Sequence, residues 1–287
     1  MSVVVTGATG RLGQAAVETL LGRGLPAGSV TAVGRDPERL SGLAERGVRT
    51  ARADYGDPAS LKAAFTGADL LLLVSGSEIG QRAAQHRNAV EAASGAGVRH
   101  IVYTSAPKAT DTTLVLAPEH AATEKIIAAS GLTSTILRNG WYNENFLPQL
   151  EEAQATGRIV GSAGEGLTAS AALRDFAEAA AAVLLEPEAH AGAVYELSGD
   201  TAWTRADLAR TLSEVLGREV VYQDVTTEEH VAALQQAGLD ADTAGFVAAL
   251  DANTRDGELG EVTDTLRRLI GRPTTPLAET LRAAVSG

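Results

Sequence analysis

Short apolar runs alternate with amphipathic runs through the first half of the chain. The apolar runs lack strict alternation, which is typical of strands that are buried on both faces of a sheet. We expect strands in the ranges 3–5, 29–34, 48–52, 68–76, 99–105 and 132–138. Between them, apolar residues recur at helical spacing in the ranges 11–24, 36–47, 57–65, 81–97 and 118–131. Strands that each lead into a helix predict an α/β fold, with a doubly wound parallel sheet between two layers of helices.

The pattern becomes looser after residue 138. We expect helices at 147–157 and 173–188, a strand at 193–199, and a helix followed by a strand within 204–225. From residue 226 onward the spacing is mostly helical. The chain is therefore expected to divide into a Rossmann-type domain, 1–138, and a smaller, mostly helical part, 139–287. Late elements of the sheet are expected to be interleaved with this second part.

Composition and charge narrow the classes of function. The net charge is −12 and no strong basic patch is visible, which argues against nucleic-acid binding. There is no cysteine, which excludes disulfides and thiolate chemistry, and no His or carboxylate cluster has the spacing of metal ligands. The longest aliphatic run begins at Leu70 and is far shorter than a membrane span, and the N-terminus does not resemble a signal peptide. We expect a cytoplasmic protein without metal or membrane contacts. The sequence does not decide between a monomer and a homodimer.

The sequence GATGRLG directly follows the first expected strand and opens the first expected helix. Its three glycines recur every third residue. A helix N-terminus offers free N–H groups and the positive end of the helix dipole to a phosphate, and glycine leaves the approach open. This predicts a dinucleotide-binding loop, although a merely tight turn would use the same residues. The loop residues expected at the cofactor are Gly7, Thr9, Gly10, Arg11, Leu12 and Gly13.

The end of the second strand indicates which dinucleotide binds. A carboxylate at this point would hold the ribose hydroxyls of NAD, whereas this chain has Arg35, whose planar guanidinium can pair with the 2′-phosphate of NADP. Asp36 follows, but it is also well placed to cap the helix that begins at Pro37. NADPH is therefore the expected cofactor, with NADH as the alternative if Arg35 is only a solvated surface residue.

Polar and glycine residues after the third and fourth strands are further cofactor candidates. Asp54 and Tyr55 are expected beside the adenine. Ser75 and Gly76 are expected near the ribose and the phosphates.

The glycine loop and the strand order together resemble the short-chain dehydrogenase/reductase superfamily. Those enzymes usually carry a Tyr-x-x-x-Lys pair on the helix after the fifth strand. Here that helix reads PEHAATEK, so His120 and Glu124 occupy the two slots, and Lys125 points about 100° away. The motifs GATGRLG, YTSAPKA, EHAATEK and LRNGWYNEN resemble the atypical NmrA-like branch, especially its type 2 NAD(P)H:quinone oxidoreductases and the related triphenylmethane reductases. The resemblance covers the whole chain.

The resemblance implies an NADPH-dependent reductase that passes a hydride directly to a quinone or a quinone-like dye, without a flavin. The missing tyrosine is consistent with this acceptor. Hydride addition to an ordinary ketone gives an alkoxide that needs a positioned acid. A quinone gives a phenolate-like anion instead, with a pKa of roughly 10 by analogy with tyrosine, and water can protonate it later.

Residues at the end of the fifth strand and on the helix that follows it have more than one interpretation. His120 lines the acceptor pocket or donates a hydrogen bond to the quinone oxygen. The alternative for this stretch is that Glu119 and Glu124 only support the helix. Ser105 lies at roughly the serine position of the superfamily and is a cofactor candidate, although it could simply cap the strand.

The segment RNGWYNENF follows the sixth strand, where open α/β sheets bind ligands. By resemblance it lines both the nicotinamide and the substrate, so that Asn139 and Gly140 are cofactor candidates. Trp141 and Tyr142 offer flat aromatic faces, and Asn143 offers amide hydrogen bonds. Together with His120, Tyr142 and Asn143 are the catalytic candidates. The alternative is an aromatic hinge between the two parts of the chain.

A different class of function also fits the nucleotide loop. NmrA-like proteins include NADP-sensing regulators with little or no catalysis, which would not need an acceptor pocket. An isomerase or epimerase of the extended dehydrogenase group is less consistent with the sequence, because those enzymes usually retain the tyrosine.

Overall fold

The structure is a computed structural model that describes residues 1–286, and the chain in it forms two compact units. Unit 1 comprises Met1–Thr110, Pro118–Asn139 and Leu173–Glu196. Unit 2 comprises Asp111–Ala117, Gly140–Ala172 and the chain from Leu197 onward. Each unit is therefore assembled from segments that are separated in the sequence.

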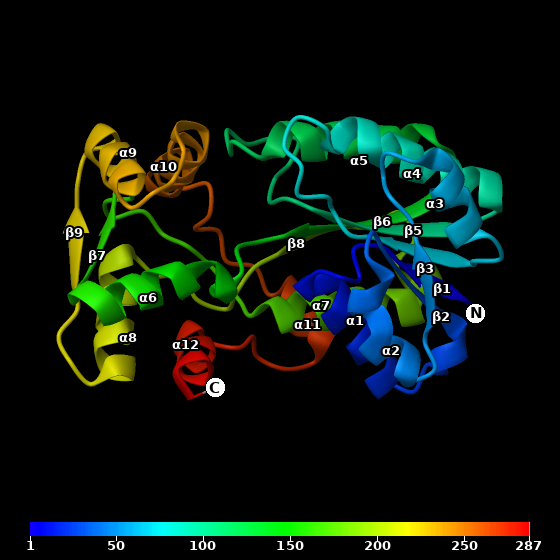
Figure 1. Cartoon of the computed structure of the whole chain (residues 1–287), viewed down its shortest axis with the longest axis horizontal. Helices are drawn as coiled ribbons and strands as arrows, with labels where there is room; N and C mark the ends of the chain where they lie inside the picture. The colour runs from blue at the N-terminus through cyan, green and yellow to red at the C-terminus, as the bar shows by residue number, and fades with distance from the viewer. Residues whose placement is uncertain (287) are drawn as a thin grey trace. The chain divides into compact units, whose positions relative to one another are not determined.

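Unit 1 is built on a seven-stranded sheet with the order β3-β2-β1-β4-β5-β6-β8 (Figure 1). Neighbouring strands from β3 to β6 pair in parallel. Chain order reverses at β1, which has β2 on one side and β4 on the other, as in a doubly wound sheet. The strands are β1 Val3–Val5, β2 Val30–Gly34, β3 Arg49–Arg52, β4 Leu70–Leu73, β5 His100–Ser105, β6 Thr133–Asn139 and β8 Val194–Leu197.

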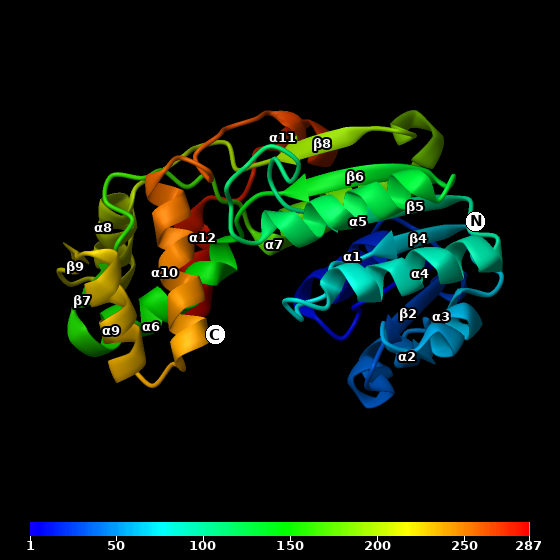
Figure 2. The ribbon, with the colours of Figure 1, turned by 90° about the horizontal axis from the view of Figure 1, so that it is seen from above.

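Helices cover both faces of this sheet. Figures 1 and 2 show α3, α4 and α5 on one face and α1 and α7 on the other. The α-helices of unit 1 are α1 Arg11–Gly22, α2 Ser41–Glu45, α3 Pro58–Phe65, α4 Arg82–Ala96, α5 Ala117–Ala129 and α7 Leu173–Leu185. Three short 3-10 helices accompany them: η1 Ala27–Ser29, η2 Pro37–Leu40 and η4 Pro187–His190.

The central strands are buried along their whole length because helices cover both of their faces. Every residue of β1, of β4 and of β5 is buried. Parallel strands covered by helices on both faces have no solvent side, so they read as continuous hydrophobic runs. This confirms the expected α/β fold with a doubly wound parallel sheet.

Unit 2 is mostly helical and contains a parallel pair of strands, β7 Arg158–Gly161 and β9 Val221–Asp224. A cluster of buried apolar side chains, which includes Phe146, Leu212 and Leu281, holds together the helices α6, α8 and α12, whose bounds follow. The helices of unit 2 are η3 Asn143–Phe146, α6 Leu147–Thr156, α8 Arg205–Leu216, α9 Thr227–Gln236, α10 Ala241–Arg255, α11 Thr265–Ile270 and α12 Leu277–Ser286.

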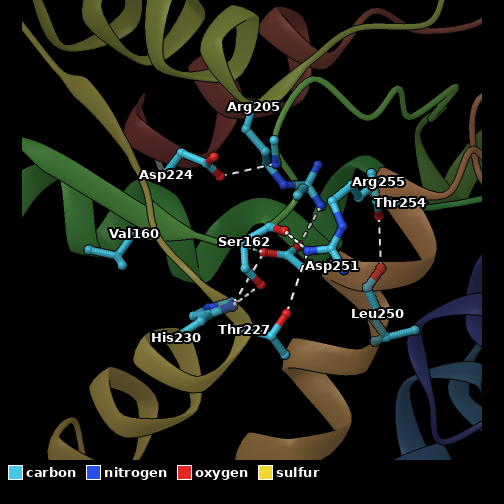
Figure 3. A network of polar contacts seen from close by, with 12 residues as sticks. Val160, Ser162, Arg205, Asp224, Thr227, His230, Leu250, Asp251, Thr254 and Arg255 are labelled. Atoms are coloured by element: carbon cyan, nitrogen blue, oxygen red, sulfur yellow. Dashed lines mark hydrogen bonds and ion pairs between the residues drawn. The ribbon is translucent and has the colours of Figure 1, made fainter.

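A buried ion pair lies at the centre of unit 2 (Figure 3). Arg205 donates to Asp251 Oδ1 at 3.0 Å and to Thr168 Oγ1 at 3.2 Å. Asp251 Oδ2 accepts from the Ser162 backbone N–H at 2.9 Å and lies 3.4 Å from His230 Nδ1. These contacts join α8, α9 and α10 to the end of β7, so the cluster fixes how the elements of unit 2 pack.

The Ser, His and Asp of this cluster do not form a hydrolase triad. Ser162 Oγ lies 3.1 Å from His230 Nδ1, which is the same ring nitrogen that faces Asp251. A triad needs the serine and the aspartate on opposite ring nitrogens, so that a proton can pass through the imidazole. The cluster is therefore a packing element.

Two local expectations differ from the structure. The expected helix at 36–47 is split into η2 and α2 at Ser41, because Leu40 does not have helical backbone angles. The strand β7 was not expected, because the four residues Arg158–Gly161 show no clear apolar pattern on their own. Its partner is β9, in which Val221 pairs with Arg158, 63 residues earlier in the chain.

Candidate functional site

Backbone contacts shape the glycine loop between β1 and α1. Gly7 has φ +62°, in the left-handed region that favours glycine. A Cβ at Gly13 would lie 2.5 Å from the carbonyl oxygen of Gly7, so no side chain fits there. Gly10 is the N-cap of α1, and its N–H donates to the Gly7 carbonyl at 2.9 Å. The glycine spacing thus follows from one tight turn that brings the loop against the start of the helix.

The first turn of α1 is open to an anion. Gly10 provides no side-chain cap, and the turn has no acidic residue, whereas α8 begins with a side-chain capping box. The first backbone bond of the helix runs from the Gln14 N–H to the Gly10 carbonyl, so the N–H groups of the three residues between them have no partner in the helix. Free N–H groups at the positive end of a helix dipole bind phosphate. The loop therefore fits the pyrophosphate of a dinucleotide.

The other loop residues differ in where their side chains lie. Leu12 is buried, so only its backbone is available to a ligand, and Arg11 is exposed. Thr9 packs against the end of β2, since a Cβ at Gly34 would lie 2.4 Å from Cγ2 of Thr9. Within this loop, Arg11 alone carries a charge that could reach a bound nucleotide.

Arg35 is the residue after β2 and already has a partner. Its Nη1 donates to Glu78 at 2.6 Å, and the arginine side chain is 66% exposed. Gln85 donates to the other carboxylate oxygen of Glu78 at 2.7 Å. Asp36 accepts from the Glu38 N–H, which confirms it as the N-cap of η2. Asp36 is thus accounted for by capping, while Arg35 remains on the surface with a carboxylate that a phosphate would have to replace.

Asp54 and Tyr55 follow β3 and differ in their availability. The Tyr55 hydroxyl donates to the Val74 carbonyl at 2.6 Å and lies 2.7 Å from Thr6 Oγ1, and burial raises the pKa of the phenol. It therefore ties the ends of β1, β3 and β4 together. Asp54 accepts from the Gly56 N–H at 2.7 Å and is exposed, so its carboxylate remains accessible.

Ser75 and Gly76 begin the loop after β4, and their backbone is held by neighbouring elements. The Ser75 N–H donates to Thr104 Oγ1 at 2.9 Å. The Gly76 N–H donates to His86 Nε2 at 3.0 Å, and its carbonyl accepts from Arg82 Nε at 2.7 Å. The fold thus fixes this loop at the carboxyl end of the sheet before any ligand binds.

His120 lies on α5 and is hydrogen-bonded to the sheet. Its Nδ1 is 2.8 Å from the hydroxyl of Tyr103, a fully buried residue of β5. Burial, helped by the nearby charge of Arg82 and by His86, lowers the pKa of His120 to about 3. The imidazole is therefore neutral at pH 7, so it can donate or accept a hydrogen bond but is not a charged acid.

Glu124 lies one turn further along α5 in an almost buried ion pair with Arg138. Arg138 donates to both of its carboxylate oxygens, at 3.0 and 2.7 Å, and also to Glu196 at 2.9 Å. These hydrogen bonds, with that to Glu124 the strongest, raise the pKa of Arg138. Ser105 Oγ donates to Glu124 at 2.6 Å. Both carboxylate oxygens of Glu124 are therefore engaged by neighbouring side chains.

Sequence reasoning missed the partner of Glu124, although a signal was present. Ser105 and Arg138 are directly opposite each other in the ladder between β5 and β6. An acidic residue in the slot where the superfamily has lysine needs a cation nearby, and Arg138 at the end of the adjacent strand could have been identified on that basis. Ser105 is thus bonded to a side chain of α5 and does not cap its own strand.

Asn139 and Gly140 fall in different units. Asn139 is the last residue of β6, in unit 1, and is buried. Gly140 begins a segment of unit 2, where its N–H donates to the Leu197 carbonyl at 2.7 Å. A Cβ at Gly140 would lie 2.6 Å from that same oxygen, so close packing of two backbone segments accounts for this glycine.

Trp141 and Tyr142 are half-buried in unit 2. The Trp141 side chain packs against two apolar clusters of the unit, one that includes Phe146 and one that includes Leu114. Tyr142 forms an isolated parallel bridge with Ala171. Both residues contribute to the packing of unit 2 and retain exposed surface.

Asn143 is fully buried, and its amide is already bonded within unit 2. Its Nδ2 donates to the Thr275 carbonyl at 3.0 Å and to Thr280 Oγ1 at 3.1 Å. Its Oδ1 accepts from Ser170 Oγ at 2.6 Å. A hydrogen bond from this amide to a substrate would require one of these bonds to be given up.

Neither a metal-ligand cluster nor a membrane-spanning helix occurs among the described residues. Within residues 1–286, no three or more His, Asp or Glu side chains gather as a metal site would require. None of the helices in this range is both long and apolar enough to cross a bilayer.

Comparison with known proteins agrees with the loop geometry. A family model described as NAD(P)H-binding matches residues 7–187. Quinone oxidoreductase 2 of Escherichia coli (strain K12) is 45% identical over 279 residues, which cover 97% of each chain. The crystal structure of an NADPH-dependent quinone oxidoreductase of Escherichia coli with NADPH bound has a TM-score of 0.94 and 44% identity, and covers 99% of both chains. Triphenylmethane reductase of Citrobacter sp. with NADP(H) also has a TM-score of 0.94, with 40% identity over 99% of this chain and 100% of that one. The chain therefore belongs to the NAD(P)H-binding family, together with quinone oxidoreductase 2.

Proposed function

We propose that the protein is an NADPH-dependent reductase that transfers a hydride directly to a quinone or a quinone-like dye, without a flavin. The observation that carries the proposal is the chemistry of the two α5 positions where dehydrogenases keep tyrosine and lysine. His120 is neutral, and Glu124 is bound to Arg138 and Ser105. Neither position offers the tyrosine hydroxyl that protonates an alkoxide in the superfamily, whereas a phenolate-like product needs no such acid. The likeness to quinone oxidoreductase 2 supports the same acceptor class.

The residues that would hold NADPH are in unit 1. The free N–H groups at the start of α1 would bind its pyrophosphate, and Arg35 would leave Glu78 to pair with the 2′-phosphate. When bound, NADPH would supply the hydride, and the quinone would take up that hydride and one proton to give the hydroquinone. The chain itself would orient the reactants and exclude competing acceptors.

The candidates for contact with the acceptor belong to both units: His120 to unit 1, and Trp141, Tyr142 and Asn143 to unit 2. His120 would offer a neutral hydrogen bond to the quinone oxygen, which strengthens as charge develops there. Trp141 and Tyr142 would present aromatic faces to the flat acceptor. Asn143 is the weakest of the candidates, because both of its amide N–H groups are already donated within unit 2.

The direct test is oxidation of NADPH by the purified protein, followed by absorbance, with a panel of benzoquinones, naphthoquinones and triphenylmethane dyes. We expect turnover with these acceptors, none with aliphatic aldehydes, and no stimulation by added FMN or FAD. Tight NADPH binding without turnover of any acceptor would contradict the enzyme and favour a nucleotide sensor. Dependence on added flavin would contradict direct transfer.

A variant pair distinguishes acceptor binding by unit 2 from the packing of that unit. Trp141→Leu is expected to raise the KM for the quinone and to leave the Kd for NADPH unchanged. Asn143→Ala removes three hydrogen bonds from a buried position, so we expect it to lower the thermal midpoint as well as activity. Loss of activity in Asn143→Ala at an unchanged midpoint would instead indicate a direct contact with the substrate.

A further inference from the structure

Tyr103 belongs to a buried hydrogen-bonded cluster in unit 1 that also contains His86, His120 and Thr123. We infer that Tyr103 is a positioning residue that holds the His120 proton on Nε2, so that this nitrogen donates a hydrogen bond to the acceptor oxygen. The inference rests on the proposed function, because it names the atom that contacts the quinone. Its first part, the location of one proton, can be measured without turnover.

The backbone fixes the proton positions at one end of the cluster. The Gly76 N–H can only donate, so His86 Nε2 accepts from it. Burial, helped by the charge of Arg82, lowers the pKa of His86 to about 3, so the ring carries one proton at pH 7, and that proton is on Nδ1. It is donated to Thr123 Oγ1 at 3.0 Å. The Thr123 hydroxyl in turn donates to the Glu119 carbonyl at 2.9 Å, which can only accept.

The proton of the Tyr103 hydroxyl then decides the state of His120. The Thr123 hydroxyl already donates to the Glu119 carbonyl and cannot also donate to Tyr103. The Tyr103 hydroxyl therefore donates either to Thr123 Oγ1 or to His120 Nδ1. An imidazole nitrogen is a much stronger base than an alcohol oxygen, and Nδ1 is only 2.8 Å from the phenol oxygen. Tyr103 therefore donates to Nδ1. Because His120 is neutral, its one proton must be on Nε2.

Nε2 of His120 remains open to a ligand. No residue among 1–286 hydrogen-bonds it, yet it is not among the solvent-excluded polar atoms that lack a partner. The small part of His120 that stays exposed, 5%, therefore includes this nitrogen. The opposite tautomer would place a lone pair there, which would repel a quinone oxygen. The hydroxyl of Tyr103 thus decides whether His120 attracts or repels the acceptor.

The proton position can be read by NMR of the full-length protein labelled with ¹⁵N-histidine. Long-range ¹H–¹⁵N correlations distinguish a protonated ring nitrogen from a bare one. The signals of His120 are assigned by their loss in His120→Gln, among five histidines in the chain. We expect Nε2 protonated and Nδ1 bare in the native protein, and an increased share of protonated Nδ1 in Tyr103→Phe.

Turnover then tests the contact with the acceptor. Tyr103→Phe should lower kcat with a quinone by about three- to tenfold, the effect of one neutral hydrogen bond, with the Kd for NADPH unchanged. His120→Gln keeps an N–H donor near the Nε2 position and should lose less than His120→Leu. The matched control is Tyr195→Phe, because the Tyr195 hydroxyl also lies 2.8 Å from a histidine Nδ1, that of His190. It should leave kcat unchanged.

Each result decides one part. Protonated Nδ1 in the native protein, or identical spectra for native protein and Tyr103→Phe, overturns the role given to Tyr103. The expected spectra with an unchanged kcat in Tyr103→Phe overturn the contact between His120 and the acceptor. Absence of quinone turnover in the native protein refutes the proposed function, and the spectra still decide the proton position on their own.

Discussion

Replacing Gly13 by alanine should weaken NADPH binding more than it affects folding. A Cβ at this position would lie 2.5 Å from the Gly7 carbonyl oxygen, 2.7 Å from its carbon and 2.9 Å from Ala8 Cα. All three are backbone atoms, so the loop must move away by about half an ångström to reach even a tight contact. Hydrogen bonds to a phosphate tolerate only about that range of donor–acceptor distance.

The expected magnitude follows from the bonds that the shift disturbs. Each hydrogen bond to a charged group contributes about 1.5–3 kcal/mol, so loss of one bond weakens binding by about tenfold or more. Overpacking costs the fold about 1–3 kcal/mol, but alanine is a better helix former than glycine by about 1 kcal/mol. These two effects leave a net cost to folding of about 0–2 kcal/mol, against about 1.5–3 kcal/mol for each hydrogen bond lost, so binding should be weakened more than folding.

Gly22→Ala is the matched control, because Gly22 lies in the same helix and a Cβ there would meet nothing within 4 Å. It should leave the Kd for NADPH unchanged and keep or raise the thermal midpoint. The assay is titration of NADPH by fluorescence or calorimetry, alongside thermal unfolding of each variant. Native affinity in Gly13→Ala would refute the view that the nucleotide binds against this turn.

Three further changes test other parts of the structure. Arg35→Gln should raise the KM for NADPH by about tenfold and barely change that for NADH, measured by steady-state kinetics; equal effects on both would contradict a 2′-phosphate contact. Asp251→Asn leaves the buried Arg205 without its counter-charge and should lower the free energy of unfolding by about 3–5 kcal/mol, measured in urea. Asp264→Asn, at an exposed ion pair, should lower it by less than about 1 kcal/mol. Equal losses of unfolding free energy in the two variants would contradict the burial argument. Stability should also fall on acidification, because the folded pKa values of His86 and His120 are about 3, below the unfolded value near 6.5. The contribution of each histidine to the free energy of unfolding is complete above pH 6.5 and is lost as the pH falls towards 3. Each histidine should lower the free energy of unfolding by about 2 kcal/mol at pH 5, and an unchanged thermal midpoint between pH 7 and 5 would contradict this.

Sequence reasoning recovered the sheet because its signal is local. The run from Leu70 to Leu73 is buried on both faces and needs no knowledge of its neighbours to be recognised as a strand. The glycine loop was recognised for the same reason, since three glycines between a strand and a helix indicate a phosphate-binding turn within one short segment. In contrast, the strand that begins at Arg158 was missed, because it exists only through its pairing with Val221.

The partners of the site residues were harder to predict, because they depend on tertiary packing. Nothing in the sequence indicates that the tip of Tyr103 reaches His120, or that Glu78 lies beside Arg35. Asn143 is the clearest example. Its amide suited a substrate contact when only the sequence was considered, but its actual partners are more than 130 residues away on one side and 27 on the other.

The chain passes back and forth between its two units, and this limits how the protein can fold during synthesis and where it can be truncated. Unit 1 obtains the helix that packs on α1, and the strand beside β6, from Leu173–Glu196. A ribosome that has released only the first 138 residues has therefore not yet supplied the cover for one face of the sheet. The buried side of α7 is rich in alanine and includes Phe176, so its absence would expose apolar surface on α1 and on the strands beneath. We expect a gene fragment that ends at residue 138 to yield aggregated protein, and nascent chains to depend on chaperones until residue 196 has emerged.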